Sequence, residues 1–241
     1  MLAAEAMRLA AIEVLLPTAS QLSGGPYPTL AKHRVYDSKS AAIEDLDRNG
    51  PATPVIALYK PESGVALRGE ASAADDTVAD AVLDIVVEMA VIAKLSDDEG
   101  GEEFSDATAD DDPTARLVLA TLCAQIRRLL ERSQQGGLWR TLVRRIIKTE
   151  YLTFAVPNLG LRWQRVTIRM HCEIRDDDLD METEGLPEPM RTLHAKLPEG
   201  SYAKGKLTEL AAYFAPEIIP RLGEIHVHTD AGESGPTFPT I

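Results

Sequence analysis

Residues 79–94, ADAVLDIVVEMAVIAK, decide the fold of this chain, and the other segments are placed relative to them. Every second residue in the middle of this stretch is apolar: Leu83, Ile85, Val87, Met89 and Val91. Such alternation, rich in β-branched side chains, is typical of a strand with one buried face. The other face mixes Asp84 and Glu88 with valine and isoleucine, so we expect Asp84→Asn to be tolerated. The stretch is predicted to be the central strand of a sheet.

The segments before this strand predict one helix and two strands. Residues 2–16 place Leu2, Leu9, Ile12 and Leu16 on one stripe, as in an amphipathic helix, and Pro17 ends it. Residues 33–38 and 53–59 have the composition of short strands. Residues 60–78 are rich in small side chains, which leaves two interpretations open, a mobile loop or an extended hairpin.

An acidic run follows the central strand at residues 96–112, SDDEGGEEFSDATADDD. Nine of its residues are acidic, and Phe104 is its only large apolar side chain. A segment with so little apolar surface cannot offset the entropy of ordering. It is predicted to be a flexible insertion.

A basic region comes next. Residues 113–132 have the apolar periodicity of a long helix, Gly136 and Gly137 break it, and residues 138–148 are predicted to form a second helix. Seven basic side chains lie on the other faces: Arg127, Arg128, Arg132, Arg140, Arg144, Arg145 and Lys148. A solvated basic face is the simplest interpretation of such a run.

Residues 163–174 alternate regularly, with apolar side chains on one face and polar ones on the other, and predict a strand. Residues 176–241 are rich in proline and glycine, with a short helix expected at 206–214 and a short strand at 224–229. The predicted fold is α/β of the α+β kind, with a mixed, mostly antiparallel sheet flanked by helices. Its core domain spans 1–175, and 176–241 form a C-terminal extension.

Charge is distributed unevenly along the 241 residues, which carry a net charge of −13. Residues 113–175 contain 12 basic and 3 acidic side chains, whereas 1–112 contain 8 and 22, and 176–241 contain 5 and 13. The overall charge disfavours nonspecific DNA binding. Unlike segments can pair within one monomer or between neighbouring copies. Cys123 and Cys172, both in apolar patterns, are expected to be buried free thiols.

The sequence carries no recognisable catalytic pattern. Its glycine pairs do not match a phosphate-binding motif, so no enzyme activity, cofactor or metal site is predicted. No run of about 18 apolar residues is present, so no membrane partner is expected either.

The order of these elements and their residues resembles the tail-terminator proteins of long-tailed phages, the family of the phage lambda U protein. The resemblance covers residues 1–175, and these stretches carry it: 7–16 (MRLAAIEVLL), 34–39 (RVYDSK), 53–59 (TPVIALY), 79–93 and 162–174 (RWQRVTIRMHCEI). The acidic run and the C-terminal extension depart from the family's compact domain.

The resemblance implies a structural virion protein of the tail or neck, present in the host cytoplasm during assembly. Six copies would form a ring that caps the tail tube and stops its polymerisation. The ring would offer a surface to the head connector or a head-completion protein, and an acidic lumen would let DNA pass without specific binding. Alternatives are another neck or tail protein, either an adaptor or a tube protein, and a metal-dependent nuclease using Asp84, Glu88 and Lys94.

Candidate contacts between subunits, or with a neighbouring virion protein, come from the unlike charge runs. The acids Asp97, Asp98, Glu99, Glu102 and Glu103 would pair with basic residues of an adjacent copy, namely Arg140, Arg144, Arg145 and Lys148. The alternative is a solvated acidic spacer that never orders.

Overall fold

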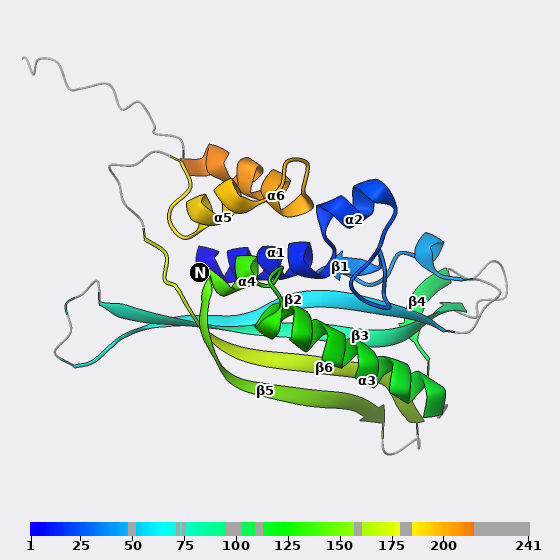
Figure 1. Ribbon diagram of the computed structural model, residues 1–241. Coiled ribbons are helices and arrows are strands. Elements are labelled where there is room, and N and C mark those ends of the chain that lie inside the picture. The colour runs from blue at the N-terminus through cyan, green and yellow to red at the C-terminus, as the bar shows by residue number, and fades with distance from the viewer. Residues whose placement is uncertain are drawn as a thin grey trace, which may run out of the picture.

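Helices cover one face of a single β-sheet in this protein (Figure 1). The computed structural model describes residues 1–47, 52–70, 73, 76–94, 103–108, 113–156, 161–178 and 185–214. Within them the sheet has six strands in the order β1-β2-β3-β6-β5, with β4 beside β3. Only the β1–β2 pair is parallel. The prediction of a mixed, mostly antiparallel sheet flanked by helices is confirmed.

The strands are β1 (Val35–Asp37), β2 (Thr53–Leu67), β3 (Thr77–Lys94), β4 (Glu103–Ala107), β5 (Val143–Val156) and β6 (Leu161–Ile174). As predicted, β3 is central. Its one edge pairs with β2, and its other edge pairs first with β6 and then, from Ala90 to Lys94, with β4. Of the predicted segment 60–78, residues 60–67 and 77–78 belong to an extended hairpin, because β2 and β3 remain paired as far as Leu67 and Thr77.

The helices are α1 (Leu2–Leu15), α2 (Thr18–Ser23), α3 (Pro113–Arg127), α4 (Gly137–Arg140), α5 (Met190–Lys196) and α6 (Tyr202–Ala211). Two short 3₁₀ turns, η1 (Ile43–Asp45) and η4 (Ala212–Phe214), and a π turn, η2 (Arg128–Arg132), complete the regular structure. α1 and α3 lie next to the sheet, and α5 and α6 lie on the outer side of α1 (Figure 1).

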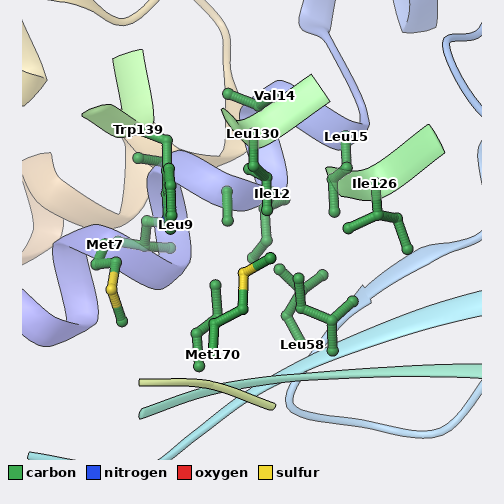
Figure 2. Packing of buried hydrophobic residues seen from close by; sticks show 14 of the residues in the cluster. Met7, Leu9, Ile12, Val14, Leu15, Leu58, Ile126, Leu130, Trp139 and Met170 are labelled. Atoms are coloured by element: carbon green, nitrogen blue, oxygen red, sulfur yellow. The ribbon is translucent and has the colours of Figure 1, made fainter. Parts of the chain in front are cut away.

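The main core lies between the helices and the sheet. Leu83, Ile85, Val87 and Met89 of β3 all contribute to it, as the alternation predicts. Figure 2 shows side chains of α1, including Met7 and Ile12, packed toward Leu58 and Met170 of the sheet. A smaller cluster lies on the opposite face, where Tyr36, Ala41, Leu46, Val55, Ala57 and Ala90 pack together.

Helix α1 is buried on almost every side and is not simply amphipathic. The reason is that α5 and α6 cover the side that would otherwise face solvent. Asp177, just after β6, accepts hydrogen bonds from the backbone N–H groups of Leu2 (2.8 Å) and Ala3 (2.5 Å). A carboxylate there is stabilised by the unpaired N–H groups of the first helical turn. The segment after residue 175 therefore closes the helix layer.

Two predictions about the middle of the chain are wrong. Residues 138–148 do not form one helix, because α4 ends at Arg140 and β5 starts at Val143, where β6 supplies hydrogen-bond partners along a whole strand. The flexible insertion is wrong for Glu103–Ala107, which form β4 against β3. Backbone pairing needs no apolar side chains, so acidic composition did not prevent it. Residues 96–102 and 109–112 lie outside the described residues.

The described part of the segment 176–241 shares the main core. Met190, Leu193, Leu197, Ala203 and Leu207 of the α5–α6 region are buried in it. The helix predicted at 206–214 is α6, which begins earlier, at Tyr202, and α5 was not predicted. The strand predicted at 224–229 lies outside the described residues.

Candidate interaction surfaces

The sheet face opposite the helices carries two ion pairs that join β3 to β6. Asp84 accepts two hydrogen bonds from the Arg169 guanidinium, at 2.8 and 2.7 Å, and Glu88 accepts one from Arg165 at 2.7 Å. Both acids are buried, with exposed fractions of 9% and 6%. The hydrogen bond from Arg169 to Asp84 raises the pKa of that guanidinium. The expectation that Asp84→Asn is tolerated does not fit this geometry.

The same face continues across β6 onto β5 with more exposed pairs. Glu150 lies 2.7 Å from the Lys148 ammonium and 3.0 Å from Nε2 of His171, and Arg145 lies 2.7 Å from Glu173. Hydrogen bonds from Lys148 and His171 hold the pKa of Glu150 below its usual value. Exposed pairs of this kind contribute little to stability, so they shape the charge of the surface more than they hold the fold.

Strand β5 is a long free edge. Within the described residues it pairs only with β6, so the N–H and C=O groups of its outer side have no strand partner. Large apolar side chains are exposed along it: Ile147 (60%), Tyr151 (48%), Leu152 (44%) and Phe154 (49%). A long, exposed apolar edge strand is a template for pairing with another segment.

A groove of about 1030 Å³ runs between α3 and the β5–β6 hairpin. Leu119, Cys123 and Val166 give it an apolar lining, and arginines from both sides rim it: Arg116, Arg127, Arg128, Arg132, Arg162 and Arg165. Among the described residues of the lining, Glu131 is the only acid, and it is paired with Arg127 through a 2.6 Å hydrogen bond. The groove exists because α3 packs over β3 and β6 and leaves the same face of β5 open. Its chemistry suits an apolar segment that carries negative charge.

The predicted contact residues divide among three places. Arg144, Arg145 and Lys148 lie together on the exposed part of β5. Arg140 serves the fold, because its guanidinium donates to the carbonyl oxygens of Leu130 (2.6 Å) and Ser133 (2.5 Å). Glu103 begins β4, which pairs with the same edge of β3 as β6 does, past the end of the β6 pairing. Asp97, Asp98, Glu99 and Glu102 lie outside the described residues.

The groove was not predicted, because residues 138–148 were expected to be helical and no element was expected at 149–156. The alternation in KTEYLTFAV, residues 148–156, was the signal that pointed to a strand. The ion pairs were not predicted either, since Asp84 and Arg169 are far apart in sequence and meet only through the β3–β6 register.

Across the described ranges, no group of three or more His, Cys, Asp or Glu side chains is arranged to hold a metal ion. No helix in this part of the chain has the length and apolar character needed to cross a membrane. No protein-family model matches the sequence, and a comparison with curated proteins finds no match.

Proposed function

We propose that this protein is a structural virion component that forms a closed, hexameric ring at the end of a phage tail tube, where it stops tube growth and receives the head connector or a head-completion protein. The protein acts by assembly, in the host cytoplasm and then in the virion. It has no catalytic role in this proposal, and DNA passes through the ring without specific binding.

The observation that carries the proposal is the free edge of β5 beside an arginine-rimmed groove. Such a surface calls for a protein partner, because it combines unpaired backbone, exposed apolar side chains and charge of one sign. A ring requires contacts in which two different surfaces of one chain meet, and the unlike charge of the chain's segments provides for them. The resemblance to tail terminators in residues 1–175 supports the same role.

Mass-resolved chromatography and electron microscopy of the full-length protein test the proposal. We expect closed rings of about six copies, and we expect rings added below stoichiometry to stop a growing tail tube of the same phage. Long tubes formed by this protein alone would instead make it a tube protein. Rings that leave tube length unchanged would remove the terminator role and favour an adaptor.

A further inference from the structure

We infer that the β5 edge and its groove receive residues 221–235 of a neighbouring copy, which add a strand to the sheet through Glu224–Thr229. This inference rests on the proposed ring, because the strand is exchanged between copies. It identifies the contact that closes the ring.

The acceptor surface offers both backbone hydrogen-bonding groups and charged side chains to an incoming segment. The outer edge of β5 has no strand partner among the described residues. In the groove, Arg127 is held by Glu131, whereas the guanidinium of Arg165 binds Glu88 on the opposite face of the sheet. Arg128 and Arg162 are exposed and form no ion pair within the described part of the chain. An incoming acidic strand would meet both free hydrogen-bonding groups and free positive charge.

The sequence of the donor fits this surface. Residues 215–241 contain four acids and one arginine. Within them Ile225 and Val227 alternate with Glu224, His226 and His228, as in a strand with one apolar face. No proline occurs between Pro220 and Pro236, so every backbone N–H in that window is available for a sheet.

Alternation also fixes how the donor strand lies. Leu152 of β5 is opposite Thr167 and points to the open sheet face, whereas Tyr151 is opposite the buried Ile168 and lines the groove. A strand added beside β5 would place Ile225 and Val227 next to Leu152. Its other face would then place Glu224 toward Arg128 and Arg162. Both faces of the added strand match the surface beneath them.

The other acidic run fits less well. Residues 95–102, LSDDEGGE, are tied at both ends, between β3 and β4. They contain only Leu95 as a large apolar side chain and show no alternation. That run can supply charge to the groove, but it cannot cover the exposed apolar side chains of β5.

The contact is also heterologous: the C-terminal segment of one copy binds the sheet edge of the next, so two different surfaces meet. α6, which precedes the donor, packs on the outer side of α1, away from the sheet (Figure 1). A contact between two different surfaces of the same chain propagates around a ring. Each copy would therefore both donate and accept one strand.

Photo-crosslinking of the full-length protein tests this contact. A photoreactive phenylalanine replaces Val227, and the linked residues are mapped by mass spectrometry after separation on a denaturing gel. We expect links between two chains that map to β5 or to the groove. A probe at the exposed Gln134 is the control and should give no such links.

Charge reversal makes the test specific. Arg128→Glu with Arg162→Glu should lower the yield of the link at least tenfold, whereas Lys32→Glu with Lys196→Glu, an equal change on exposed residues elsewhere, should leave it unchanged. Thermal melting checks that both variants fold. If the charge reversal unfolds the protein, Arg128→Gln with Arg162→Gln is used instead. Links within one chain, links elsewhere, no links, or a yield insensitive to Arg128 and Arg162 would overturn the inference.

The mass of the same samples separates this inference from the proposed function. If the wild-type protein forms rings but gives no crosslink to β5, the strand exchange is wrong and the proposed ring still stands. A protein that stays monomeric would remove the ring, and the exchange with it.

Discussion

The buried pair of Asp84 and Arg169 shows how a single charged residue can be part of the fold. Asp84 is on the central strand, nearly inaccessible to solvent, and both of its carboxylate oxygens accept hydrogen bonds from one guanidinium. A buried carboxylate without such partners would lose much more solvation energy than it regains. The pair therefore holds β3 and β6 in register, in contrast to the exposed Arg145–Glu173 pair nearby.

Asp84→Asn is expected to destabilise the protein by about 1–3 kcal/mol, since the amide loses the charge and turns an N–H donor toward Arg169. Urea unfolding measures the change. Arg145→Gln is the matched control: its side chain is 72% exposed, so its loss should cost less than about 1 kcal/mol. Equal midpoints for Asp84→Asn and wild type would show that the bidentate pair does not support the fold.

The two cysteines are both free and buried, as the sequence predicts. Their thiols should make the reactivity and the stability of the protein depend on pH. Burial raises the pKa of Cys123 to about 11 and that of Cys172 to about 12. At pH 8 both thiols should resist iodoacetamide in the native protein and react fully once it is unfolded.

Stability follows from the same shifts. The unfolded chain releases its thiol protons near pH 9, before the folded one does, so it binds fewer protons above that pH. The free energy of unfolding is therefore expected to fall as pH rises from about 9 to about 12. Urea melts at pH 8 and 10 measure this fall. If a double Cys→Ala variant loses as much unfolding free energy between pH 8 and 10 as wild type does, groups other than the cysteines cause the fall.

At the scale of elements, the turn between α3 and β5 decides where the helix layer ends. After η2, the chain reverses at Gly136, enters the short α4 and begins β5. Arg140 from α4 reaches back to two carbonyl oxygens at the end of the preceding helix. Such carbonyls have no partner within their own helix, so this contact fixes the approach of β5 to the sheet.

Gly136→Ala should destabilise this turn by roughly 1–3 kcal/mol or more, because a Cβ there would lie 2.2 Å from the Leu129 carbonyl oxygen and 2.5 Å from that of Leu130. Gly137→Ala is the neighbouring control. No atom lies within 4 Å of its added Cβ, and alanine favours the helix, so it should be neutral or slightly stabilising. Thermal melts compare the two, and a similar effect of both would contradict the crowding at Gly136.

At the scale of the whole molecule, positive charge is concentrated on one surface. The basic segment 113–175 supplies α3, β5 and β6, which form the arginine-rimmed groove, whereas the acidic excess lies in the segments on either side. A protein with a net charge of −13 therefore presents a local positive surface. Contacts between copies that use this surface must depend on ionic strength.

Salt should loosen the proposed rings. At about 1 M salt the Debye length falls to about 3 Å, which screens attraction between the groove and an acidic segment. We expect the mass measured by chromatography with light scattering to shift from ring toward monomer between low and high salt. An apolar contact would be strengthened under the same conditions, so identical oligomers at both salt concentrations would show that ring closure is not electrostatic.

The sequence by itself determined the central strand, the late strand β6, the opening helix and the class of fold. Each follows from a local period: side chains alternate across a strand, and they recur about every 3.6 residues along a helix. Leu83, Ile85, Val87 and Met89 share the buried face because neighbouring residues point to opposite sides, whatever lies around them.

Only the tertiary structure decided β4, β5 and the candidate surface. The acidic Glu103–Ala107 segment is a strand because the edge of β3 offers it hydrogen bonds, and Val143 enters a strand because β6 lies alongside. Pairing of Asp84 with Arg169 likewise depends on a register set between strands 85 residues apart. These features arise from partners distant in sequence, whose hydrogen bonds and charges outweigh local composition.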